Sequence, residues 1–426
     1  MRSEDIVIVG AGPAGCATAL RLAYLGIPSV LIDRSTFPRD KICGDAISGK
    51  VGVLLDRLDP AIMQRFRDRF QPTDVWGIRF YPPNGKLIEL PFQVDYQREY
   101  NSAPGYVSKR MDFDNFLIEE VRRRPEIELI TGVAIAKYER SEQGYTIRNI
   151  DGQHVFNCKL LLMADGAHSR FAREVGKLEK DHRHHAGAVR RYYKGVGGFH
   201  KDNFIELHFL KEINPGYFWI FSLPNGEANV GLGIRSDIIE KKKINLRKAL
   251  DQIIASEQFR DRFAQAEPLE KPIGYGLPLG SKKRRLSGDH FMLCGDAGHL
   301  IDPLTGEGIG NAVYSGFIAA ELAEKCLAEN RFDAEYMLAY DRRIKRVLRK
   351  EMILSYRLQQ VMQHQRITNF LTSFIAGNPR LIETMTRMYT DLELRKQLIN
   401  PIFWWRQIRG SKQIAEKQQS GAVKPM

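Results

Sequence analysis

Residues 5–33 have the pattern of one strand–helix–strand unit, and this unit constrains the fold more than any other stretch. The β-branched run DIVIV is typical of a buried parallel strand, and CATALRLAYLG has a helical pattern that stops at Gly26. IPSVLID then indicates a second strand, which ends in Asp33. The turn GAGPAG joins the first strand to the helix, so about thirty residues form a dinucleotide-binding βαβ unit.

Each glycine of GAGPAG has a physical role in such a unit. Gly10 allows the tight turn, Gly12 lets the backbone approach a pyrophosphate, and Gly15 lets the helix pack closely on the strand. Free N–H groups at the helix start point at the phosphates. Asp33 is placed to accept hydrogen bonds from the adenosine ribose. The alternative, a glycine-rich turn without a ligand, does not need all these parts together.

A second stretch, FMLCGDAGHLIDPLTGEGIGNAV, repeats this physical arrangement. Gly295 and Asp296 end an apolar strand, and the glycines of GEGIG precede a helix. An acid at a strand end and free backbone N–H groups suit the ribityl chain and pyrophosphate of a flavin. The backbone amides of Gly308 and Ile309 would lie near the isoalloxazine ring. The predicted cofactor is therefore FAD.

Composition narrows the class of protein. The 426 residues contain no run near the ~20 apolar residues of a membrane span, and the N-terminus enters a strand without a secretory signal. We therefore expect a cytoplasmic protein. Five scattered cysteines without a CxxC pair argue against a disulfide framework or a thiolate zinc site. The histidine-rich HRHH at 182–185 is interpreted as a solvated loop, so no metal site is expected.

Several motifs together carry a family resemblance. GAGPAG with Asp33, SKRMDFDNFL, MADGAHSR and LCGDAGHLIDPLTGEGIG occur in the order found in flavoproteins similar to p-hydroxybenzoate hydroxylase. Within that group, KICGDAISG and PGYFWIFSLPNGEANVGLG make the chain resemble the geranylgeranyl reductase family. The second stretch departs from that family's Tyr-x-Trp-x-Phe-Pro pattern, because Ser222 and Leu223 stand before Pro224. The resemblance covers residues 5–320.

The resemblance implies an α/β fold with a Rossmann-type FAD-binding domain, an antiparallel-sheet substrate domain and a C-terminal helical region. The alternating pattern at 205–234 agrees with antiparallel sheet. The polar end of the helical region is expected to be disordered. The expected boundaries are 1–75, 101–170 and 271–330 for the FAD-binding domain, 76–100 and 171–270 for the substrate domain, and 331–426 for the helical region.

The resemblance also implies a set of flavin contacts. Arg110 would supply a fixed positive charge near the flavin, although a surface helix arginine is the alternative. The pair Asp165-Gly166 either lies beside the cofactor or forms a plain turn. The cofactor-binding residues are expected to be Gly10, Gly12, Ala14, Gly15, Asp33, Arg34, Cys43, Gly44, Ala46, Arg110, Ala134, Asp296, Gly308 and Ile309.

Cys43, in KICGDAISG, is the candidate catalytic residue. Reducing an isolated alkene requires a proton at one carbon as hydride reaches the other, and a thiol beside the flavin could donate it. The alternative is an inert buried cysteine, and Cys294 is the main rival. Tyr217, Trp219 and Phe221 share one face of a strand, which is either the wall of a prenyl-chain tunnel or ordinary sheet core.

The predicted function is FAD-dependent reduction of carbon–carbon double bonds in a prenyl chain. NAD(P)H or a reduced electron carrier would re-reduce the flavin. The alternatives are an aromatic hydroxylase on the same fold and an electron carrier to a membrane quinone. A halogenase is disfavoured because Trp-x-Trp-x-Ile-Pro is absent.

The net charge of +13 has several explanations in principle, among them an anionic membrane surface. We expect no nucleic-acid partner, and the sequence leaves the oligomeric state open. A prenyl-lipid substrate would be found in a membrane. Peripheral contact with the inner membrane face is therefore a possible role for three segments, namely the basic run at 342–350, FLTSFIAG and NPIFWWRQIRG. Solvated or packed helices are the alternative.

Overall fold

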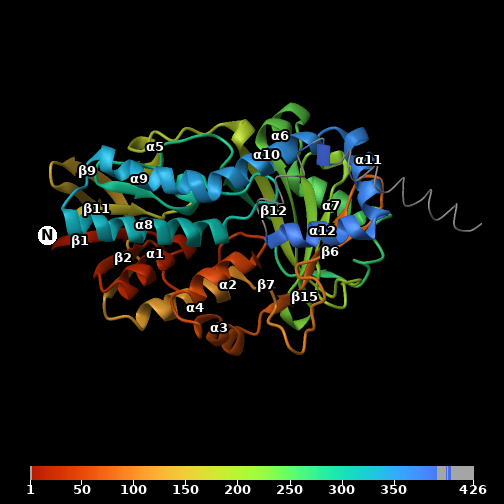
Figure 1. Ribbon diagram of the computed structural model, residues 1–426, viewed down its shortest axis with the longest axis horizontal. Coiled ribbons are helices and arrows are strands. Elements are labelled where there is room, and N and C mark those ends of the chain that lie inside the picture. The colour runs from red at the N-terminus through yellow and green to blue at the C-terminus, as the bar shows by residue number, and fades with distance from the viewer. Residues whose placement is uncertain (1, 391–399, 401, 404–426) are drawn as a thin grey trace, which may run out of the picture.

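The predicted βαβ unit forms the centre of a mainly parallel sheet in the computed structural model, which describes residues 2–390, 400 and 402–403 (Figure 1). Strand β1 lies between β2 and β11 and pairs in parallel with both. The order is β18-β19-β11-β1-β2-β8, and β9 and β10 extend β11 as an antiparallel hairpin. The bounds are β1 (Arg2–Val9), α1 (Pro13–Tyr24), β2 (Ser29–Asp33), β8 (Ile127–Thr131), β9 (Ile135–Ser141), β10 (Gly144–Asn149), β11 (Val155–Met163), β18 (Ser287–Gly288) and β19 (Phe291–Leu293).

A second sheet stands beside the first and has the order β16-β12-β15-β14-β13-β5-β6, with β17 paired to β12. Its pairs are antiparallel except β13 with β5, so the expected antiparallel pattern at 205–234 is confirmed. The strands are β5 (Gly77–Tyr81), β6 (Ile88–Pro91), β12 (His185–Lys194), β13 (Ile205–His208), β14 (Tyr217–Ser222), β15 (Glu227–Arg235), β16 (Glu267–Pro268) and β17 (Ile273–Pro278). A small sheet joins β3 (Ala46–Ile47), β7 (Gly105–Val107) and β4 (Thr73–Val75).

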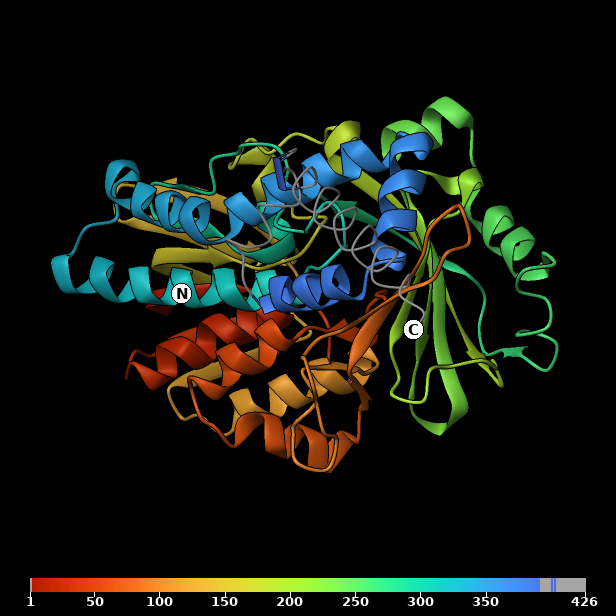
Figure 2. The same ribbon diagram turned by 45° about the vertical axis from the view of Figure 1, so that its right-hand side comes forward.

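Helices cover both sheets. The C-terminal helices run from the parallel sheet to the second sheet, as Figures 1 and 2 show in blue. A π-helical turn at Lys345–Arg349 joins α9 to α10. The helices are α2 (Gly49–Asp56), α3 (Ile62–Phe70), α4 (Arg110–Arg122), α5 (Arg170–Glu174), α6 (Ser236–Lys242), α7 (Leu246–Ala255), α8 (Ile309–Glu329), α9 (Ala334–Ile344), α10 (Lys350–Met362), α11 (Gln365–Ala376) and α12 (Pro379–Thr390).

Close packing of α1 against α8 fixes the centre of the molecule. A Cβ atom at Gly316 would lie 2.6 Å from the backbone oxygen of Ala14 and 2.7 Å from the hydroxyl of Thr18, so glycine is needed there. Both helices are largely buried in one apolar core with the strands of the parallel sheet. The α/β fold class is confirmed, while the exact domain boundaries stay a prediction. None of the described helices combines the length and apolarity needed to cross a membrane.

Candidate active site

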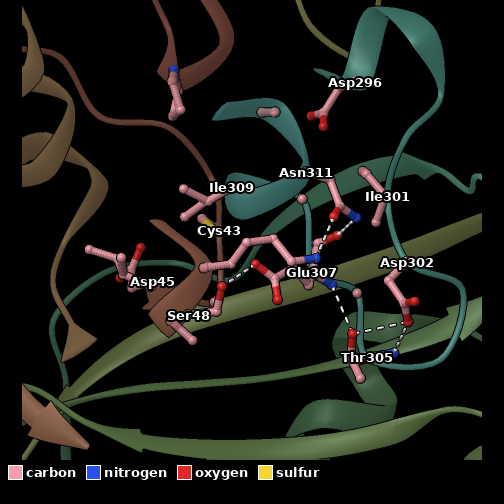
Figure 3. Close-up of a pocket in the computed structure, with 18 of the residues that line it drawn as sticks. Cys43, Asp45, Ser48, Asp296, Ile301, Asp302, Thr305, Glu307, Ile309 and Asn311 are labelled. Carbon is pink, nitrogen blue, oxygen red and sulfur yellow. Dashed lines mark hydrogen bonds between the residues drawn. The ribbon is translucent and has the colours of Figure 1, made fainter. Parts of the chain in front are cut away.

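A cavity of about 1770 Å³ lies where the parallel sheet, the second sheet and the C-terminal helices meet. Pockets for a single small ligand are usually about 300–1,000 Å³, so this cavity has room for a cofactor and a second molecule. Figure 3 shows part of its wall, with Cys43, Asp45 and Ser48 from one segment and Glu307, Ile309 and Asn311 from another. The hydroxyl of Ser48 donates to Glu307 at 2.5 Å and joins these segments.

The structure brings the predicted site residues together. Except for Gly15, each of them contributes to the cavity wall. Gly15 is buried in α1, where a Cβ atom would lie 1.7 Å from the Gly10 carbonyl oxygen. The lining residues are Gly10, Gly12, Ala14, Asp33, Arg34, Cys43, Gly44, Ala46, Arg110, Ala134, Tyr217, Trp219, Phe221, Asp296, Gly308 and Ile309.

The first glycine turn has the geometry of a phosphate site. Gly10 has φ of +103°, and a Cβ atom there would lie 2.3 Å from the Ala164 carbonyl oxygen. Gly12 differs, because its nearest neighbour would be a nitrogen of Arg39 at 3.8 Å, so its backbone borders open space. Asp33 accepts hydrogen bonds from the N–H groups of Ala11 at 2.7 Å and Ser35 at 2.8 Å. The acid therefore holds the turn and still lines the cavity.

The second turn places another helix start at the same cavity. Helix α8 begins at Ile309 after Gly308, and the Glu307 side chain accepts from the N–H of Gly310 at 3.2 Å, whereas no side chain caps α1. The start of α1 and the positive ends of both helix dipoles therefore face the cavity, which favours bound phosphate groups. Asp165, two residues after the end of β11, has a buried carboxylate oxygen without a protein partner, and burial raises the pKa of Asp165 to about 6. These features fit FAD.

Arg110 is not on the surface, so the surface alternative was wrong. Its side chain is buried and donates to Asp114 at 2.7 and 2.8 Å. Arg39 donates to the same carboxylate at 2.6 Å. Burial would raise the pKa of Asp114, but the guanidinium charges outweigh it and hold this pKa below the usual range. The Arg110 guanidinium also interacts with Cys43, which places a fixed positive charge beside the thiol.

The segment that carries Cys43 is tied to the second sheet by a polar network that sequence reasoning missed. Asn229 of β15 donates through one amide nitrogen to the backbone oxygen of Cys43 at 2.8 Å and to Asp45 at 2.9 Å. Trp219 donates to the Asn229 amide oxygen at 2.8 Å, and Tyr192 donates to Asp45 at 2.6 Å. Asp45 has φ of +66° and is fully buried. The position of Asp45, two residues after Cys43, was the feature of the sequence that could have indicated this network.

The cavity continues as an apolar arm along the second sheet. Tyr217, Trp219 and Phe221 lie on one face of β14, with successive ring centroids 6.1 and 6.2 Å apart. A Cβ atom at Gly231 would lie 2.3 Å from the Trp219 ring, so glycine makes room for it. The face both packs in the core and lines the cavity. Further apolar lining comes from Ile78, Phe80, Leu90, Phe92, Leu207 and Met385.

The histidines of HRHH have separate partners. His182 contacts Glu240, His184 contacts Ser281 and His185 contacts Ser236. Within the described part of the chain, no group of three or more His, Cys, Asp or Glu residues is placed to hold a metal ion.

Comparison with known proteins agrees with this geometry. Residues 3–350 match the family described as FAD binding domain. Digeranylgeranylglycerophospholipid reductase 2 of Methanopyrus kandleri is 30% identical over 344 residues, which cover 80% of this chain and 81% of the relative. Menaquinone reductase of Mycobacterium tuberculosis is 30% identical over 330 residues, covering 76% of this chain and 77% of the relative.

A solved structure supports the fold. A geranylgeranyl bacteriochlorophyll reductase-like protein from Thermoplasma acidophilum superposes with a TM-score of 0.78 at 21% identity, covering 93% of this chain and 99% of that one. The fold and the cavity thus define an FAD-dependent oxidoreductase. By its sequence matches, the chain belongs to the geranylgeranyl reductase family of these flavoproteins.

Gly12→Ala tests the first turn. Because the protein leaves space at Gly12, we expect the variant to unfold at the wild-type temperature when prepared without FAD. The methyl group would enter the space of the pyrophosphate, so FAD should bind on the order of tenfold more weakly in a fluorescence titration. Gly316→Ala is the contrasting control, since its methyl group clashes inside the protein and should lower thermal stability. Unchanged FAD affinity in Gly12→Ala would contradict this placement of the cofactor.

Proposed function

We propose that the protein reduces carbon–carbon double bonds of a prenyl lipid. The observation that carries this proposal is one cavity that joins two flavin-type helix starts, the Cys43 segment and an apolar arm lined by Tyr217, Trp219 and Phe221. The names of the relatives support it, since digeranylgeranylglycerophospholipid is a prenylated lipid and menaquinone carries a prenyl tail.

Some residues of the cavity would bind the cofactor and the lipid, and Cys43 would transfer the proton. Bound FAD, in its reduced form, supplies the hydride. The two turns and Arg110 hold and orient this cofactor, through the cofactor-binding residues named above. The aromatic face of β14 places the chain and excludes water. Cys43 donates the proton to the second alkene carbon. Its thiol is partly exposed, and it lines the cavity that joins the flavin turns to the apolar arm.

The reductant would reach the flavin without a binding domain of its own. Gly231 and Gly233 lie inside strand β15, and a side chain at Gly231 would meet Trp219, so they do not form a nucleotide turn. The described residues offer no second strand–turn–helix unit with GxGxxG. NAD(P)H or a small reduced carrier would therefore approach through the same cavity.

Peripheral contact with an anionic membrane is a further part of the proposal. Arg342, Lys345, Arg346 and Lys350 are exposed, and Phe370 of α11 is 58% exposed. Helix α10, which follows this basic segment, lines the cavity through Met352, Ser355 and Gln359, so a lipid leaving the bilayer would meet the cavity wall. FLTSFIAG forms part of α11, whereas most of NPIFWWRQIRG lies outside the described residues.

Anaerobic reoxidation tests the reaction. After reduction with dithionite, the bound flavin should be reoxidised by a geranylgeranyl glycerophospholipid, and each turnover should add two mass units to that lipid. Mass spectrometry of the lipid and the flavin absorbance are measured together. Saturated phytanyl lipid is the control and should leave the flavin reduced. Reoxidation by menaquinone with a tail of unchanged mass would support an electron carrier instead, and reoxidation by oxygen alone with an aromatic substrate would support a hydroxylase.

Cys43→Ala tests the proton donor. We expect FAD to bind normally, while the rate of alkene reduction falls about 10²-fold or more because the general acid is lost. Cys294→Ala is the matched control, since Cys294 is buried and its hydrogen-bond partner is Tyr340. Stopped-flow flavin reoxidation at saturating lipid gives both rates. Equal rates for Cys43→Ala and wild type would contradict the role of this thiol.

Vesicle sedimentation tests the membrane contact. Replacing the four exposed basic residues at 342–350 by Gln should weaken binding to vesicles with anionic lipid at least about tenfold, because each such charge contributes roughly 1 kcal/mol near the surface. Replacing exposed Lys241 and Lys243 by Gln is the control and should leave binding unchanged. The proposal is wrong if both sets weaken binding equally.

A further inference from the structure

Asp45 is a buried acid that the reaction described so far does not use. Its side chain has no solvent exposure, and it lines the cavity two residues after Cys43. One carboxylate oxygen, Oδ2, accepts hydrogen bonds from Tyr192 and Asn229. The other, Oδ1, is buried and has no protein partner. Burying such an oxygen is costly, and protonation of Oδ1 lowers that cost because the carboxyl group becomes neutral.

The surroundings of Asp45 bring its pKa close to neutral pH, so both its protonated and its ionised form are populated. Burial raises the pKa of Asp45 to about 6 against the opposing hydrogen bonds from Tyr192 and Asn229. The charges of Arg190 on β12 and Arg110 on α4 also lower it, and Cys43 is the titratable neighbour on its own segment. At neutral pH the group can therefore both give up and regain a proton, unlike an ordinary surface aspartate.

Other nearby groups are less suited to proton supply. Arg110 stays charged at every pH of interest. Burial raises the pKa of Tyr217, and its hydroxyl donates to the backbone oxygen of Thr305. Asn229 holds Cys43 and Asp45 in a fixed relation through one amide nitrogen. Among the titratable groups named here, Asp45 combines a suitable pKa with a place in the Cys43 segment.

We propose that Asp45 supplies the proton that restores the Cys43 thiol after each reduction. The inference rests on the proposed function. Bound reduced FAD would supply the hydride, and the proton of the thiol would complete the second new C–H bond as the alkene π bond breaks, which would leave a thiolate on Cys43. The O–H bond of Asp45 then breaks and the S–H bond forms again. The carboxylate then regains a proton from solvent before the next cycle.

Protein-supplied protons matter here because an apolar chain in the arm excludes bulk water from Cys43. The positive charge of Arg110 beside Cys43 stabilises the thiolate until the proton arrives. Asp45 thus acts through Cys43 and does not itself meet the alkene.

The first test is a kinetic comparison of Asp45→Asn with wild type. The first reduction uses the proton already on Cys43, so the single-turnover rate should stay within about twofold. Steady-state turnover, which needs a new proton each cycle, should fall on the order of tenfold to a hundredfold. In wild type, turnover should also decrease as pH rises through about 6, because the protonated fraction of Asp45 declines, and the variant should lose this dependence. An equal loss in both rates, or no loss in either, would overturn the proposal.

The second test needs no lipid substrate. All five cysteines are described, and Cys43 alone is not buried, so iodoacetamide should alkylate it selectively in the FAD-bound protein. If Asp45 and Cys43 are coupled as proposed, ionisation of Asp45 should slow alkylation, so the plot of log rate against pH should bend near pH 6. Asp45→Asn should remove the bend and raise the rate at pH 7 several-fold. Tyr192→Phe, which removes a hydrogen bond to Asp45, should move the bend to higher pH.

The two tests separate the two proposals. Suppose that wild type reduces no prenyl lipid, but the alkylation plot bends near pH 6 and the bend shifts in Tyr192→Phe. The proposed function would then be wrong, and the coupling of Asp45 to Cys43 would be supported. A straight plot in wild type, identical to that of Asp45→Asn, would overturn the coupling even in an active alkene reductase. Peptide mass spectrometry confirms that the alkylated residue is Cys43.

Discussion

The contact between α1 and α8 determines where the chemistry can occur. Gly316 brings α8 against the backbone of Ala14, at a distance that a methyl group would not allow. Because each helix begins at the cavity, this contact aims the positive ends of two helix dipoles at the same space. Wider separation of the helices would divide the anion-binding ends between two places, and one extended dinucleotide could no longer use both.

The Cys43 segment depends on a second set of constraints, which comes from the other sheet. Tyr192, Asn229 and Trp219 belong to three adjacent strands. Tyr192 and Asn229 donate to Asp45, Asn229 also donates to the Cys43 backbone oxygen, and Trp219 donates to Asn229. Hydrogen bonds through Asn229 therefore connect the aromatic face of the apolar arm to the backbone of Cys43. A shift of the β14 face would move Cys43 as well, so recognition of the chain and delivery of the proton are linked through Asn229.

Local sequence patterns indicated the glycine turns at the cavity, but they did not indicate the polar network around Cys43 and Asp45. GAGPAG, Asp33 and the Gly295-Asp296 stretch are read within single strand–turn–helix units, where short-range physics decides the structure. Arg110 illustrates the limit, since its burial depends on Asp114 in the same helix and on Arg39 from a distant loop. The partners of Asp45 are 147 and 184 residues away in sequence, and no periodicity pairs residues at such separations.

The shared fold does not by itself select reduction. The distinction must come from the wall opposite the flavin turns. Here that wall holds a thiol, a buried carboxyl group with one unpaired oxygen, and a row of aromatic rings. A thiol and a carboxyl group can exchange protons, and the apolar rings suit a hydrocarbon chain, so the wall favours hydride addition to a hydrocarbon.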